Sequence, residues 1–120
     1  MITPEVAREY KQELPGWIKI EDVKDKKYQE FLTTRIDLGE ASAIALAKEN
    51  ANSLLLLDDL KSRKLAKQLN LTFTGALGII HKAKQTGVLK KIKPIIEKLQ
   101  ETDFRIAENI ITELLKKNNE

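Results

Sequence analysis

The sequence predicts a three-layer α/β/α domain with a short, mostly parallel sheet. Segments typical of strands alternate along the chain with amphipathic helical segments, and this alternation is typical of α/β domains. The clearest strand, residues 53–57, is apolar without alternation, which indicates a strand covered on both faces and therefore a parallel sheet. The helix before it carries small residues at Ala41, Ala45 and Ala47, which let it sit close against that sheet.

The N-terminal segment carries clear signals for where its elements begin and end. Thr3 suits an N-cap and Pro4 fits the first helical turn, so a short helix is expected to begin there and to end near Leu14. Pro15-Gly16 marks a turn. Residues 17–20 alternate weakly, which is typical of a short edge strand.

The rest of the chain continues as alternating helices and strands, and apolar residues at a spacing of three or four mark each helix. Helices are expected over residues 22–34, 41–47, 60–69, 75–84, 92–100 and 107–117, and strands over 53–57 and 71–74. Asn70 suits the end of the helix before it, and residues 118–120 are expected to fray. With no repeat or linker, residues 1–120 are expected to form a single domain.

Composition places the chain among small, highly charged globular domains. Its apolar share of 42% and charged share of 32% separate it from disordered chains. It has no cysteine, which excludes disulfides, thiolate metal sites and cysteine nucleophiles. No run of about 18 apolar residues could span a membrane, and the N-terminus lacks a signal-peptide core, so a cytoplasmic location is expected.

The net charge of +3 weakly favours an anionic partner, because a basic surface raises the local concentration of phosphates. Five lysines lie close together in the sequence, at Lys82, Lys84, Lys90, Lys91 and Lys93. They could follow a nucleic-acid backbone or form a solvated face. The acidic residues that follow favour the solvated face.

Three carboxylates near the central helix and strand are candidates for a metal site. Glu40 opens the helix, and Asp58 and Asp59 follow the strand at its C-terminal end, where ligands bind in open α/β sheets. If the helix packs beside the strand, the carboxylates can converge on Mg²⁺ or Mn²⁺, whose bound water is a nucleophile for phosphodiester hydrolysis. The alternative, which spacing alone favours, is capping of the two helices that begin at these residues.

Other residues with chemical potential have simpler explanations. Arg63 lies one turn beyond Asp59 and could grip a substrate phosphate, but a spacing of four favours an ion pair between the two. The glycines at 75 and 78 open a helix whose N–H groups can bind phosphate, yet close strand-to-helix packing explains them better. His81, the only histidine, is interpreted as structural or surface, and Trp17 as core or edge cover.

Several segments of the chain together resemble one family. They read LGEASAIALA, SLLLLDD followed by KSRKLA, LNLTFTGALGIIHKAKQTG, and DFRIAENIITELL, and their order and spacing are similar to a branch of the PIN domains. PIN domains are small α/β nucleases that include the VapC-like toxins of toxin–antitoxin pairs. The segment ITPEVAREY resembles the family's second helix, so the resemblance covers nearly the whole chain.

The resemblance implies a metal-dependent ribonuclease whose acidic residues hold Mg²⁺ or Mn²⁺. Glu9 matches the family's acidic residue on the second helix, and Glu40 matches the one that opens the central helix. Asp58 matches the acidic residue at the end of the following strand, with Asp59 as its neighbour. The resemblance therefore implies that Glu9, Glu40 and Asp58 bind the metal.

The resemblance also implies an N-terminally truncated PIN domain. The family begins with a central strand that ends in an aspartate, and this sequence starts at the second helix. Unpaired backbone groups in a sheet are costly. We therefore expect the strands near Ile18 and Leu55 to pair directly, or a homodimer to provide the pairing.

Two functions follow from the resemblance. The first is an endoribonuclease that cleaves RNA, as the toxin of a toxin–antitoxin pair, with an antitoxin protein as its partner. The second is a catalytically inactive PIN relative that acts as a protein-interaction or regulatory module. The retained Glu9, Glu40 and Asp58 favour the first, and the missing aspartate favours the second.

Overall fold

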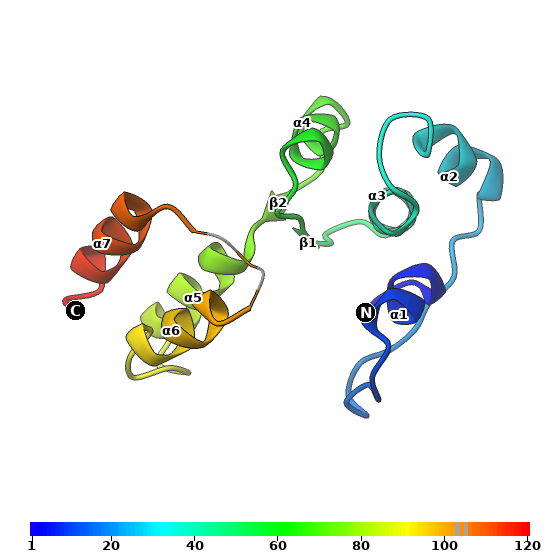
Figure 1. Ribbon diagram of the computed structural model, residues 1–120. Coiled ribbons are helices and arrows are strands. Elements are labelled where there is room, and N and C mark those ends of the chain that lie inside the picture. Colours follow the sequence, from blue (N-terminus) through cyan, green and yellow to red (C-terminus); the bar gives the residue numbers. More distant parts are fainter. Residues whose placement is uncertain (103, 105) are drawn as a thin grey trace. The chain divides into compact units, whose positions relative to one another are not determined.

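The computed structural model describes residues 1–102, 104 and 106–120, which form two compact units, Met1–Gly75 and Ala76–Glu120. Helices and a short parallel sheet alternate along the chain (Figure 1), so the predicted α/β fold class with a parallel sheet is confirmed. Asp103 and Arg105, two residues of the C-terminal segment that carries the resemblance, lie outside the described residues. No helix in the described part of the chain is long and apolar enough to cross a membrane.

The elements of the first unit begin close to where their capping residues predict. They are α1 (Pro4–Tyr10), α2 (Lys26–Leu32), α3 (Leu38–Glu49), β1 (Leu55–Leu56), α4 (Leu60–Gln68) and β2 (Phe73–Thr74). The Thr3 hydroxyl accepts the N–H of Val6 at 3.2 Å, which confirms the predicted N-cap of α1. The helix ends at Tyr10, before the predicted Leu14, because Lys11 adopts a left-handed conformation with φ of 58°.

Helix α3 forms the centre of the core of the first unit. Ala41, Ile44 and Ala45 are fully buried, and α1 and α2 both pack against α3. Leu32 of α2 is also buried in this core. Small side chains at the helix surface allow these close approaches, which are to helices α1 and α2, whereas the sequence predicted a close approach to the sheet.

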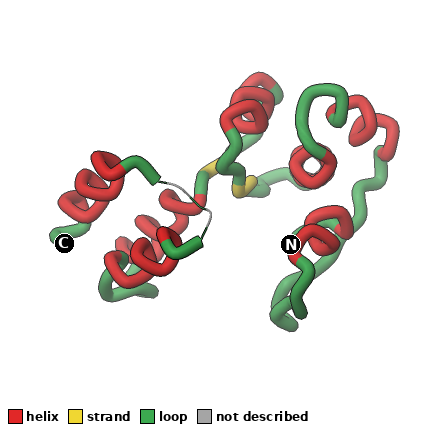
Figure 2. The backbone as a smooth tube through the Cα atoms, in the orientation of Figure 1, coloured by secondary structure: helices red, strands yellow, loops and turns green. Residues whose placement is uncertain are grey.

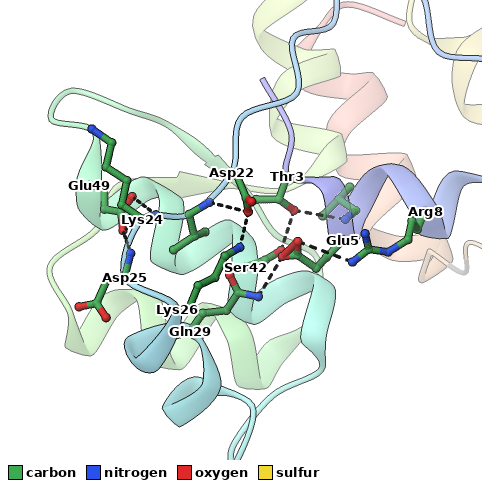
Figure 3. A network of polar contacts seen from close by, with 12 residues as sticks. Thr3, Glu5, Arg8, Asp22, Lys24, Asp25, Lys26, Gln29, Ser42 and Glu49 are labelled. Carbon is green, nitrogen blue, oxygen red and sulfur yellow. Dashed lines mark hydrogen bonds and ion pairs between the residues drawn. The ribbon is translucent and has the colours of Figure 1, made fainter.

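A network of polar contacts joins α1, α2 and α3 (Figure 3). The hydroxyls of Thr3 and Ser42, both buried, are 2.6 Å apart. The side-chain amide of Gln29 donates to the buried Glu5 carboxylate at 2.9 Å. The Glu49 carboxylate accepts two main-chain N–H groups just before α2. These hydrogen bonds link the three N-terminal helices, although the buried Tyr28 hydroxyl and Oε1 of Gln29 have no partner among the described residues.

The sheet of the first unit consists of β1 and β2, which run parallel and are short (Figure 2), with Leu55 opposite Phe73. The N–H groups of Leu55 and Leu57 donate to the carbonyls of Thr72 and Thr74 at 2.9 and 2.8 Å. Alternate residues of a strand form hydrogen bonds with the same neighbouring strand. The backbone N–H and C=O of Leu56, between Leu55 and Leu57, therefore face the opposite edge of β1. No described residue pairs with β1 along that edge.

Burial along β1 alternates, and the prediction that this strand is covered on both faces is wrong. Leu55 and Leu57 are 6% and 3% exposed, whereas Leu54 and Leu56 are 61% and 54% exposed. Only one face of the strand packs into the core that surrounds α3. An apolar run does not distinguish a strand buried on both faces from one with an exposed apolar face.

The predicted pairing between the segments near Ile18 and Leu55 is also wrong for the described residues. The segment after the Pro15-Gly16 turn pairs instead with the start of the chain, through a parallel bridge between Ile20 and Ile2. Ile2 donates its N–H to Lys19 at 2.8 Å and accepts from Glu21 at 2.9 Å. The start of the chain therefore forms the backbone hydrogen bonds with this segment that the sequence predicted for β1.

A groove of about 450 Å³ is lined by β1, α3 and the start of the chain. Its lining residues are Met1, Ile2, Thr3, Val6, Ala43, Leu46, Ala47, Asn50, Ser53, Leu54, Leu55 and Leu56. None of them has a charged side chain, although charged residues make up 32% of the sequence. The groove is therefore lined by uncharged side chains, and three of them come from Leu54, Leu55 and Leu56 at the strand β1.

The second unit consists of helices α5 (Ala76–Gln85), α6 (Lys93–Gln100) and α7 (Glu108–Lys117). Ile92 and Ile96 are its buried apolar residues among those described. Gly87, with φ of 83°, follows the end of α5 close to where the sequence predicts a helix end. Compared with the first unit, little apolar surface holds these helices together.

The prediction that residues 118–120 fray is wrong. Asn118 is 6% exposed, and its side-chain amide lies 2.9 Å from both the Leu114 carbonyl and Nδ1 of His81. His81 is therefore structural, in agreement with its interpretation from the sequence. Side-chain contacts from distant residues hold this end of the chain in place.

The Glu120 carboxylate connects α5 to the start of α6. It accepts from Nζ of Lys84 at 2.7 Å and from the main-chain N–H groups of Ile92 and Lys93 at 2.9 and 3.2 Å. The hydrogen bond from Lys84, together with the main-chain donors, lowers the pKa of Glu120 from 4.5 to about 2. The carboxylate thus remains charged under all ordinary conditions.

Candidate functional site

Glu40 and Asp59 meet on the buried hydroxyl of Ser62. Glu40 lies in the first turn of α3, and Asp59 directly precedes α4. The Ser62 hydroxyl donates to Oε2 of Glu40 and lies 3.2 Å from Oδ2 of Asp59. The same Asp59 oxygen accepts the N–H of Ser62 at 3.0 Å, so Asp59 is the N-cap of α4, as the capping alternative predicts.

Sequence reasoning missed Ser62 as a site residue. The available signal is its position three residues after Asp59, where a polar side chain commonly faces the N-cap residue. Ser62 is fully buried, so its hydroxyl orients both carboxylates from beneath the site.

Asp58 and Arg63 crowd around Gly75, which is buried and directly follows β2. A Cβ atom on Gly75 would overlap Nη2 of Arg63 and would lie 2.8 Å from Oδ1 of Asp58. Gly75 therefore allows both side chains to approach the ends of the two strands. The prediction was close packing of a strand against a helix at both glycines, but Gly75 makes room for side chains and Gly78 is exposed.

The predicted ion pair between Arg63 and Asp59 is wrong for the described residues. Nε of Arg63 donates instead to the main-chain carbonyl of Leu57 at 2.8 Å. That carbonyl is at the end of β1, and a guanidinium satisfies it while Asp59 faces the N–H groups of α4. Through this hydrogen bond Arg63 stabilises the loop that contains Asp58.

Glu9 lies against the first turn of α3. A Cβ atom on Gly39 would be 2.5 and 2.7 Å from the two carboxylate oxygens of Glu9. This places a third carboxylate, from α1, at the helix end that also carries Glu40. A negative charge at a helix N-terminus is favourable, because the exposed N–H groups there carry partial positive charge.

The donor atoms around β1 are all oxygens of carboxylates and a hydroxyl, which are ligands that suit Mg²⁺ or Mn²⁺. Magnesium commonly uses one or two protein carboxylates and completes its shell with water and substrate phosphates. Among the described residues, no three His, Cys, Asp or Glu side chains are close enough to share one ion. The chemistry of the donors fits such a metal. The Glu9 and Glu40 carboxylates lie at the first turn of α3, and Asp58 and Asp59 directly follow the strand β1 region.

Trp17 is 82% exposed, so its interpretation as core or edge cover is wrong. It lies in the turn after Pro15, where the N–H of Ile18 bonds back to the Pro15 carbonyl at 3.0 Å. A turn projects its side chains from the surface, which explains the exposure.

A family model described as a PIN domain matches residues 1–120, the whole chain. No curated protein and no solved structure matches the chain.

Proposed function

We propose that this chain, which belongs to the PIN-domain family, is a metal-dependent endoribonuclease that hydrolyses RNA phosphodiesters. The observation that carries the proposal is that the Glu40 and Asp59 carboxylates both contact the buried hydroxyl of Ser62. Asp59 directly follows Asp58 in the sequence. This cluster lies at the carboxyl end of a parallel strand, which is where open α/β sheets bind ligands.

In this proposal Glu9, Glu40 and Asp58 are the carboxylates that would hold Mg²⁺ or Mn²⁺, and Asp59 supports them. Because no three described acidic side chains lie close enough to share one ion, water and substrate phosphate would complete its shell. When bound, the metal supplies a nucleophilic water and neutralises charge on the phosphate. Ser62 orients the Glu40 carboxylate, and Asp59 fixes Ser62 through the start of α4. Arg63, anchored through Nε, is proposed to meet a substrate phosphate with its remaining N–H groups.

The test is RNA cleavage with Mg²⁺ or Mn²⁺, comparing the chain with the variant Asp58→Asn. Loss of a metal ligand removes several kcal/mol of transition-state stabilisation, so we expect cleavage to fall by about 100-fold or more. Glu30→Gln, which removes an exposed carboxylate from α2, is the matched control and keeps full activity. The proposal is contradicted if the chain and Asp58→Asn cleave RNA at equal rates, or if the cleavage rate does not depend on the metal.

We also propose that the nuclease is a cytoplasmic toxin that an antitoxin protein holds in check. Production of the chain in bacterial cells is then expected to slow growth, and Asp58→Asn is expected to relieve the effect. A small open reading frame beside the gene should supply a protein that restores growth. Growth inhibition that persists in Asp58→Asn argues against toxicity through RNA cleavage.

The second candidate function is an interaction module, and the uncharged groove beside the open edge of β1 favours it. We propose a homodimer in which these edges pair across a two-fold axis, because exposed strand edges readily add another strand. Sedimentation should show a dimer that Leu56→Lys converts to a monomer. Leu60→Lys changes an equally exposed leucine outside the groove and should leave the dimer intact. A monomeric parent chain contradicts this proposal.

A further inference from the structure

The positive charge of this chain is concentrated in its second unit. Residues 1–75 contain twelve basic and twelve acidic residues, whereas residues 76–120 contain nine basic and six acidic residues. Residues 76–96 contain five lysines and no acidic residue. The whole excess of charge therefore belongs to the helical unit, at a distance in sequence from the carboxylates of the candidate site.

The fold of the second unit gathers these lysines at one end of the α5–α6 hairpin. The chain folds back after α5, where the N–H of Leu89 bonds to the Ala83 carbonyl at 3.1 Å. The Glu120 carboxylate then brings Nζ of Lys84 and the main chain of Lys93 onto a single group, with bonds of 2.7 and 3.2 Å. Lysines from the last turn of α5, the connecting loop and the first turn of α6 thus share one region.

Most of this cluster is free to meet an external anion. The side chains of Lys82, Lys90, Lys91 and Lys93 are exposed, and no ion pair holds any of them within the described residues. Lys84 alone is engaged, by Glu120.

We propose that Lys82, Lys90, Lys91 and Lys93 form a binding surface for the phosphate backbone of single-stranded RNA, separate from the carboxylates that cleave it. This rests on the proposed function in so far as RNA is the substrate. The surface contains no aromatic side chain to stack on bases, so it binds through charge and without sequence preference. It holds the substrate while cleavage occurs elsewhere on the chain.

The test measures binding without cleavage. The anisotropy of a fluorescein-labelled 20-nucleotide poly(U) RNA is followed in EDTA at several salt concentrations. Changing the four lysines to glutamine should raise Kd by at least about tenfold at low salt. The slope of log Kd against log salt should fall by about 2 to 3, since each contacted phosphate of a single strand contributes about 0.7.

A control variant removes the same charge elsewhere. Lys11, Lys19, Lys27 and Lys67 are exposed in the first unit, and their change to glutamine should alter Kd by less than about twofold. Equal weakening in both variants would show that only net charge matters and would overturn the proposal. Unchanged binding in the hairpin variant would overturn it as well, provided that circular dichroism shows a folded chain.

Two further arms separate the proposal from its alternatives. The variant Asp58→Asn should bind the RNA as tightly as the parent chain. The binding measurement can therefore be interpreted even if the chain shows no RNA cleavage. Vesicles of phosphatidylserine and phosphatidylcholine test an anionic lipid surface. Binding to vesicles but not to poly(U) at the same salt concentration would overturn the assignment to RNA.

Discussion

The two units of this chain handle charge in opposite ways. The first unit balances its charges and places carboxylates at the ends of elements that a buried core fixes, with Ser62 and Gly75 inside that core. The second unit has little buried apolar surface and displays lysines on exposed positions. The proposed functions give this difference a physical reason, because side chains that hold a metal must be placed within about 0.5 Å. The phosphates of an RNA backbone, in contrast, attract the charged ends of flexible lysine side chains over several ångströms.

The largest expected effect separates cleavage from binding. Glu40→Gln removes the carboxylate that Ser62 orients, so RNA cleavage should fall by about 100-fold. RNA affinity in EDTA should stay within about twofold of the parent chain. Glu13→Gln, at an exposed position of the same unit, provides the control for a neutralised carboxylate. If Glu40→Gln also lost affinity for RNA, cleavage and RNA binding would not be divided between the two units.

The next effect comes from Gly39. A methyl group at this position must displace the Glu9 carboxylate, which can move into solvent because Glu9 is exposed. Alanine in place of glycine within a helix stabilises by about 0.5–1 kcal/mol. Gly39→Ala should therefore lower cleavage by about tenfold while the free energy of unfolding in urea stays equal or rises. Loss of both stability and cleavage would show that Glu9 has only a structural role.

A smaller effect is expected for Gly75. A methyl group there pushes Arg63 aside and disrupts its hydrogen bond to the Leu57 carbonyl, which should cost about 1 kcal/mol in urea unfolding. Gly16→Ala is the matched control, because a Cβ atom at Gly16 meets nothing within 4 Å. Equal stabilities of the two variants would contradict the packing described around Gly75.

The smallest effect concerns the second unit and depends on pH. The pKa of Glu120 is lowered from 4.5 to about 2, so its bonds to Lys84 and α6 stabilise the folded chain fully above pH 4.5. This contribution is lost as the pH falls towards 2. Glu120→Gln should lower Tm at pH 7, and the difference should shrink progressively below pH 4.5. Glu113→Gln, on the exposed face of α7, should show no such pH-dependent difference.

The sequence predicts features that depend on contacts between near neighbours. Thr3 and Asp59 cap their helices through residues three positions away, and Asn70 ends α4 in a left-handed conformation, so local chemistry determines all three. The α/β class follows from the same local patterns.

The features that the sequence did not predict depend on competition between distant partners. Ile2, not β1, pairs with Ile20, and Glu120 bonds to Lys84 across 36 residues. Arg63 had a local partner within reach and bonds instead to the carbonyl of Leu57. Such choices require knowing which backbone groups lack a partner after folding, which no local pattern records.

The hydroxyl of Ser62 carries a single hydrogen. At any moment it can donate to one carboxylate only and must turn a lone pair towards the other. Glu40 and Asp59 are thus unequal although both are acids: both face the shared hydroxyl, and Asp59 also accepts the main-chain N–H of Ser62. One serine therefore distinguishes two acidic groups, without any charged residue between them.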